Sequence, residues 1–270
     1  MPQTIRKWAA ILLALPAVLV PMIYIPLVLW ARESFLTMHQ DYMDDPPTIS
    51  RAINDPSVGV PFADLILVIT ALIMLALPLM LFAYGLAIAR LNISRRRRLG
   101  MYVLLFLMLA FQITASTGMV LTTQYSFDID HDMHMLGSYV FFFFQATTIL
   151  VAATMCKLLL HQQQRHAIPD HEWQFRPAMH LFRFRFAVLI VALAALFGIL
   201  FVAKDYPLPI SPYAVQVIYT QCEVIVIGCF VLFLGSYAVD IYHMIRNDRL
   251  RLDVVRNRPA LQAGETKEIR

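Results

Sequence analysis

Polar side chains recur at helical spacing inside otherwise apolar stretches of this 270-residue chain. Gln216, Thr220 and Glu223 follow one another at offsets of four and three residues, which places them on one face of a helix. At 1.5 Å per residue, Glu223 lies about 15 Å along that helix from Tyr213. A carboxyl group at this depth in lipid is costly, so Glu223 is a candidate functional residue. The alternative is a protonated or hydrogen-bonded carboxyl group that serves packing alone.

Two further stretches carry a similar stripe of polar residues. They comprise His134, Ser138, Gln145 and Thr148 in one stretch, and Gln112, Ser116 and Thr123 in the other. Three helices that turn such stripes inward would enclose a polar cavity that opens toward the outer side of a membrane. The competing interpretation is that the Gln, Ser and Thr side chains only join neighbouring helices by hydrogen bonds.

Two kinds of function fit such a cavity. In an enzyme, His134 would act as general acid or base and Glu223 would orient it or a lipid headgroup during acyl transfer or hydrolysis, with Ser50 as the candidate nucleophile. The chain has no G-x-S-x-G or H-E-x-x-H motif to support catalysis. The sequence therefore favours a protein that binds or senses lipid through this pocket, and lipid remodelling stays the alternative.

A short acidic and histidine-containing segment precedes the stripe that begins at His134. His131 and His134 are spaced i, i+3 beside Asp128, a pattern that could ligate a divalent metal. Acids just before a helix are also expected from the helix dipole alone. We therefore expect Asp128 or Asp130 to cap a helix, and we expect neither a metal nor another cofactor.

The composition shows what must position these residues. The chain is 59% hydrophobic and only 15% charged, with 18 Phe and 14 Met, which is more apolar surface than a soluble domain of this length can bury. A helix needs roughly 20 apolar residues to cross a bilayer core, and six stretches qualify or come close. They cover residues 10–30, 65–89, 99–121, 135–156, 186–203 and 213–239. Only a helical bundle satisfies the backbone in lipid at these lengths. The sequence thus predicts an all-α, multi-pass membrane protein.

Basic and acidic residues alternate between the two sides of this predicted bundle. Arg90 and the run 95–98 lie on one side, while Asp44, Asp55 and Asp128 lie on the other. The positive-inside rule then places both termini in the cytoplasm. We expect one bundle over residues 1–249, and a flexible cytoplasmic tail over 250–270. The outer loop would cover 31–62 and the inner loop 157–185.

The net charge of +4 and the pI near 9.0 come largely from the basic inner loops and the tail. These basic runs adjoin the membrane and carry no recognition motif for nucleic acid, so anionic lipid headgroups or a protein are the expected partners. His180 and Arg183 alternate with Phe182 and Phe184 at the edge of the fifth span, and we expect them to lie in the headgroup layer. The Pro-rich outer loop could lie as a lid over the cavity.

Three short motifs resemble those of the DRAM/Frag/Sfk family of six-span membrane proteins. Pro47-Thr48-Ile49-Ser50 is similar to the P-x-I-S element after the first span, with a further Pro61-Phe62 before the second. His134 and Gly137, followed by the Phe run 141–144, resemble the start of the family's fourth span. Cys222-Glu223 with downstream aromatic residues and Asp240 is similar to its last span, although Val224 stands where Trp often follows the Glu. The motif positions that carry over are Pro47, Ile49, Ser50, His134, Gly137 and Glu223.

This resemblance covers nearly the whole chain up to Arg249 and implies six spans. It also implies a function in lipid biology, because branches of the family act in remodelling of glycosylphosphatidylinositol anchors, in autophagy or in phospholipid distribution. It supplies no catalytic mechanism that could be carried over to individual residues.

Overall fold

The computed structural model describes residues 3–43, 46–166, 168, 173, 175–204, 206 and 209–247. Within these ranges the chain is helical and contains no strand. The helices are α1 (Gln3–Met38), α2 (Ile49–Ala52), α3 (Pro56–Arg90), α4 (Arg95–Gln124), α5 (His131–Arg165), α6 (Pro177–Ala203), α7 (Pro212–Gly235) and α8 (Tyr237–Arg246), with a 3-10 turn η1 at Gln40–Met43. The expected tail over 250–270 lies outside the described residues, and so do Asp44 and Asp45.

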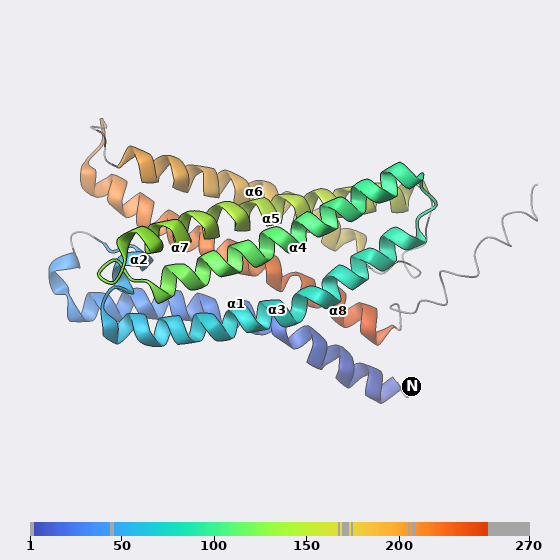
Figure 1. Ribbon diagram of the computed structural model, residues 1–270, viewed down its shortest axis with the longest axis horizontal. Coiled ribbons are helices and arrows are strands. Elements are labelled where there is room, and N and C mark those ends of the chain that lie inside the picture. The colour runs from blue at the N-terminus through green and yellow to red at the C-terminus, as the bar shows by residue number, and fades with distance from the viewer. Residues whose placement is uncertain are drawn as a thin grey trace, which may run out of the picture.

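Six helices of the described chain are long and apolar enough to cross a membrane, and α7 and α8 together form the sixth. Each of the six apolar stretches read from the sequence lies inside one of them, so the predicted helical membrane bundle is confirmed. The helices run side by side, as Figure 1 shows. The start of α1, the α3–α4 connection and α8 lie at one end, called here the α8 end. The connections around α2, between α4 and α5, and between α6 and α7 lie at the other, called the α2 end.

Several helices extend beyond the hydropathy limits. Helix α1 reaches Met38 and α3 begins at Pro56, so helix occupies part of the expected 31–62 loop. Helices α5 and α6 likewise take up much of the expected 157–185 loop. The physical reason is that hydropathy marks the hydrocarbon layer, whereas a helix of 35 residues such as α5 continues through the headgroup layer on both sides.

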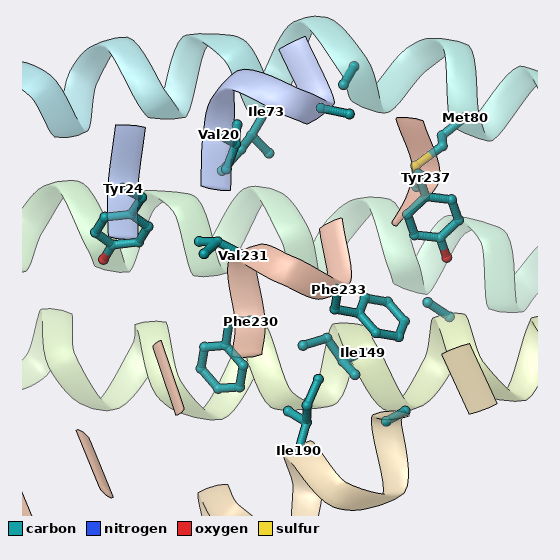
Figure 2. Packing of buried hydrophobic residues seen from close by; sticks show 14 of the residues in the cluster. Val20, Tyr24, Ile73, Met80, Ile149, Ile190, Phe230, Val231, Phe233 and Tyr237 are labelled. Atoms are coloured by element: carbon teal, nitrogen blue, oxygen red, sulfur yellow. The ribbon is translucent and has the colours of Figure 1, made fainter. Parts of the chain in front are cut away.

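Apolar side chains from all six spans meet along the axis of the bundle. Figure 2 shows the middle of this core, where side chains from α7 lie between those of the neighbouring helices. The labelled residues are Val20, Tyr24, Ile73, Met80, Ile149, Ile190, Phe230, Val231, Phe233 and Tyr237. Because lipid tails are as apolar as this core, close packing of shapes is what holds the helices together.

The expectation that His180 and Arg183 lie in the headgroup layer is wrong, because both side chains are fully buried. Arg183 forms an ion pair with Asp240 of α8 at 2.6 Å and donates through Nε to the Ser236 hydroxyl at 2.9 Å. A buried guanidinium needs such partners, and Asp240, far away in the sequence, supplies the charge. Arg185, two residues on, is exposed on the surface of α6.

Candidate functional site

The connection between α1 and α3 is fastened to α7 by two hydrogen bonds. The backbone N–H of Ile49 donates to Glu223 Oε2 at 2.9 Å, and Gln216 Nε2 donates to the carbonyl of Pro46 at 3.2 Å. The Thr48 side chain accepts from the backbone N–H of Arg51 and so begins α2 at this point. Residues 46–53, called here the α2 strap, therefore lie across the α2 end of the bundle.

Glu223 is buried in the bundle, with 4% of its surface exposed. Its carboxylate accepts a hydrogen bond from the backbone N–H of Ile49, the first residue of α2. This contact joins two of the sequence motifs, the P-x-I-S element and the last span, across 174 residues. Glu223 thus anchors the strap, and it also lines the groove described next.

A groove of about 990 Å³ runs between α5, α6 and α7. It is bounded by α5 from His131 to Leu150 and by α6 from Val191 to Phe201, and Tyr219 and Glu223 of α7 also line it. Its lining is mostly apolar and aromatic, and its volume is at the upper end of the about 300–1,000 Å³ typical of ligand pockets. Side chains along its α5 edge, such as Phe143 and Leu150, are largely exposed on the bundle surface, where lipid tails would lie.

A second hollow of about 730 Å³, called here the vestibule, continues from the groove at the α2 end. Both are lined by Thr48, Phe127, Lys204 and Tyr219, so they adjoin one another. The vestibule is more polar than the groove and also contains Arg51. Together they form one elongated space with an apolar part in the bundle and a polar part at its end.

Some of the predicted ligand-binding residues line this space. Ser50, Ser138 and Glu223 lie on the groove and Gln216 on the vestibule. Pro47 and Ile49 belong to the strap, whose neighbouring residue Thr48 lines both hollows, and both are buried.

The other predicted polar residues form hydrogen bonds within or between helices. Gln112 Nε2 donates to Gln145 Oε1 at 3.1 Å and to Ser116 Oγ at 3.3 Å, which joins α4 to α5 inside the bundle. The Thr148 and Thr220 hydroxyls donate to carbonyls within their own helices. The Gln112–Gln145 pair thus joins two helices, as the packing interpretation proposes, whereas the bonds of Ser116, Thr148 and Thr220 stay within single helices.

His134 is fully buried beside the α4–α5 connection. Its Nδ1 lies 2.8 Å from the carbonyl oxygen of Tyr125, and its ring lies 4.2 Å from that of Phe127, measured between centroids. It lines neither the groove nor the vestibule. His134 and Glu223 therefore have separate hydrogen-bond partners, and of the two only Glu223 lines the groove.

The acidic segment before α5 caps that helix, as the sequence predicts. Asp130 Oδ1 accepts from the backbone N–H of Met133 at 3.0 Å. Asp128 accepts from Asn54 Nδ2 at 2.7 Å, and the Asp128 N–H donates to Asn54 Oδ1 at 3.0 Å, which ties the segment to the residue that directly follows the α2 strap. Within the described part of the chain, no three His, Cys, Asp or Glu side chains, including His131, come together to hold a metal ion.

Sequence reasoning did not single out Lys204 and Arg51, which are the two cations of the vestibule. Lys204 ends α6, where its Nζ lies 4.9 Å from the ring centroid of Phe201 and 5.3 Å from that of Tyr219. The available signal was a single cation among aromatic residues at the end of a span, on the side where acids prevail.

Asp55 caps the first turn of α3, which follows the α2 strap in the chain. Its Oδ1 accepts from the N–H and hydroxyl of Ser57 at 2.9 and 2.7 Å, and its Oδ2 lies 2.9 Å from His39 Nε2. Hydrogen bonds from Ser57 and His39 lower the pKa of Asp55 to about 2. Because the folded pKa lies below the unfolded value, this contribution to stability is complete above about pH 4 and is lost as the pH falls through the folded value.

We therefore expect Asp55→Asn, which can keep the helix cap, to cost about 0.5–1 kcal/mol at pH 5 and almost nothing near pH 2. Thermal unfolding of both proteins across this range measures the difference. If the difference in stability between wild type and variant is the same at pH 5 and near pH 2, the Asp55 charge does not stabilise the fold.

A comparison with known protein families matches residues 7–244 to the Frag1/DRAM/Sfk1/Cwh43P N-terminal domain. No curated protein and no solved structure matches the chain significantly. The matched segment includes four of the six spans completely and nearly all of the first and the sixth, together with the α2 strap and Glu223. The chain therefore belongs to the Frag1/DRAM/Sfk1/Cwh43P family and is an integral, multi-pass membrane protein.

Proposed function

We propose that this protein binds a single membrane lipid at the α2 end of the bundle. In this proposal a lipid chain lies in the groove between α5 and α6, and the headgroup lies in the vestibule under the α2 strap. The observation that supports it is the continuity of the apolar groove with the polar vestibule, which share four lining residues. Such a space has the amphipathic pattern of a lipid.

The charge pattern gives this proposal a direction across the membrane. The Arg run 95–98 lies at the α8 end, and by the positive-inside rule that end faces the cytoplasm. The vestibule then takes a lipid from the opposite leaflet, on the outer or lumenal side. A lipid chain that moves from the bilayer into the groove passes from one apolar environment to another, so the hydrophobic effect does not favour its binding. Specificity must therefore come from packing and from the polar groups at the α2 end.

The contacts favour binding over bond cleavage. Glu223 anchors the strap through Ile49, and His134 is bonded to the Tyr125 carbonyl away from the groove. General acid or base catalysis needs its groups within hydrogen-bond reach of one reacting bond. These two side chains have separate partners, so we propose a lipid-binding role in membrane organisation or regulation.

A blocked groove tests the proposal. A Cβ at Gly198 of α6 would meet no atom within 4 Å, and Gly198 lines the groove, so Gly198→Phe places a ring in its open space. Gly85 of α3 is equally open and lines neither the groove nor the vestibule, so Gly85→Phe is the matched control. We expect the wild type and Gly85→Phe to retain a defined lipid in native mass spectrometry with lipidomics.

Gly198→Phe should retain about tenfold less of that lipid, equal to roughly 1.4 kcal/mol of binding free energy. Unfolding temperatures of the three proteins check that each is folded. If folded Gly198→Phe keeps the same lipid in the same amount as the wild type, the groove is not the binding site and the proposal fails.

A further inference from the structure

The vestibule has the charge and position of a phosphate site. We propose that it binds the phosphate group of a glycerophospholipid, with Lys204 as the principal cation and Arg51 as the second. This inference rests on the proposed function, because the groove must hold the chain of the same lipid.

Lys204 stands where the apolar and polar parts of the space meet. It lines both the groove and the vestibule, and the rings of Phe201 and Tyr219 hold its ammonium group near that junction. In a glycerophospholipid the phosphate lies between the acyl chains and the headgroup. With a chain in the groove, the phosphate would therefore reach the level of Lys204.

Arg51 supplies the second cation from the α2 strap. Its guanidinium lies 4.5 Å from the ring centroid of Tyr42, and its Nη2 donates to the Tyr42 hydroxyl at 2.7 Å. These contacts set the orientation of the guanidinium, which remains largely exposed at the vestibule wall. The fork of N–H groups on an arginine matches phosphate oxygens in geometry, and a fixed guanidinium loses less freedom on binding.

Of the described residues that line the vestibule, Lys204 and Arg51 are cationic and none is acidic. Asp128 beside it is bonded to Asn54, and Glu223 in the groove is bonded to the Ile49 N–H. A concave surface with this charge balance attracts an anion. A fatty acid could reach Lys204 with its carboxylate, but it would leave the 730 Å³ of the vestibule empty, whereas a phosphodiester headgroup occupies it.

Matched variants and defined lipids test this inference. The detergent-purified full chain is titrated in native mass spectrometry with phosphatidylglycerol and with diacylglycerol, which share chains but differ in the phosphate. A third titration adds inorganic phosphate in competition with phosphatidylglycerol. The test variants are Lys204→Gln and Arg51→Gln, and Lys204→Arg keeps the charge.

The chain offers close controls for both cations. Lys157 also lies over a phenylalanine ring, with its Nζ 4.5 Å from the centroid of Phe184, but on the α8 half of α5. Arg246 stacks on Tyr242 at 5.8 Å and donates to its hydroxyl at 3.4 Å, as Arg51 does with Tyr42. Lys157→Gln and Arg246→Gln therefore remove the same charges and ring contacts away from the vestibule.

We expect the wild type to prefer phosphatidylglycerol over diacylglycerol by about tenfold or more, as charge-assisted hydrogen bonds imply. Lys204→Gln and Arg51→Gln should lose most of this preference, while Lys204→Arg and the two controls keep it. Equal binding of both lipids by the wild type, with both lost in Gly198→Phe, would overturn the phosphate site and leave the proposed function standing.

Other outcomes are equally decisive. If neither lipid binds, this inference fails, and the lipid retained in the preceding experiment decides the proposed function separately. If Gly198→Phe binds both lipids as well as the wild type does, the proposed function fails and this inference fails with it. If inorganic phosphate displaces phosphatidylglycerol at comparable concentration, the vestibule serves soluble phosphate and the assignment to a lipid is overturned.

Discussion

Arg183→Met is expected to destabilise the bundle by about 3–5 kcal/mol, because it leaves the buried Asp240 carboxylate without its countercharge. Both side chains are fully buried, and their ion pair at 2.6 Å joins α6 to α8. The guanidinium also donates through Nη2 to the Ser236 carbonyl at 2.8 Å and lies 3.9 Å from the ring centroid of Tyr237. Unfolding in detergent, followed by circular dichroism, measures the loss.

Two further variants separate the ion pair from a general effect of the substitution. Arg185→Met removes the same side chain from an exposed position of the same helix and should change stability by less than about 0.5 kcal/mol. Arg183→Met combined with Asp240→Leu removes both charges and should recover much of the loss.

Recovery in the double variant should be incomplete, because Asp240 Oδ1 also accepts from the Arg176 backbone N–H at 3.1 Å. If Arg183→Met costs no more than Arg185→Met, the buried pair does not hold these helices together.

The six spans could be predicted from the sequence because hydropathy is a local property that each span carries on its own. The ends of the helices could not, since nothing in the hydropathy of Pro56 or Arg165 distinguishes a helix in the headgroup layer from a loop. The cap at Asp130 was predictable for the same reason as the spans, because an acid before a helix acts on its own first turn.

Contacts between distant residues were beyond sequence reasoning. The stripe on the last span identified Glu223 as unusual, but nothing local indicated that its partner is the backbone N–H of Ile49. Arg183 was expected at the membrane surface because its neighbours alternate between basic and aromatic residues. Its true partner, Asp240, lies on another helix, and only the fold reveals that an acid is buried there.

In the candidate site, too, local properties could be predicted from the sequence and contacts between helices could not. Polar residues on helical faces could be listed from spacing, yet spacing does not tell which face meets a helix and which meets a cavity. Gln112 and Gln145 therefore proved to pair with each other, while Ser138 lines the groove. Lys204 acquires its position from the rings of Phe201 and Tyr219, and Tyr219 belongs to a different helix.

Gly118→Ala is expected to lower stability by about 3 kcal/mol, although alanine favours helix over glycine by about 1 kcal/mol. The backbones of α4 and α5 touch at this point. A Cβ at Gly118 would lie 2.6 Å from the Phe141 backbone nitrogen and 2.8 Å from the Gly137 carbonyl oxygen, so the two helices would have to move apart. Small residues at such contacts are what lets membrane helices approach closely.

Gly100 supplies the matched control on the same helix, since a Cβ there meets no atom within 4 Å. Gly100→Ala gains the helix propensity without the clash and should be neutral or stabilising by up to about 1 kcal/mol. Chemical unfolding in detergent of wild type and both variants gives the two differences. Because α5 also forms one wall of the lipid groove, Gly118→Ala should weaken lipid retention together with stability, whereas Gly100→Ala should leave both intact. Equal stability of the two variants would show that the close α4–α5 contact is not what fixes the groove wall.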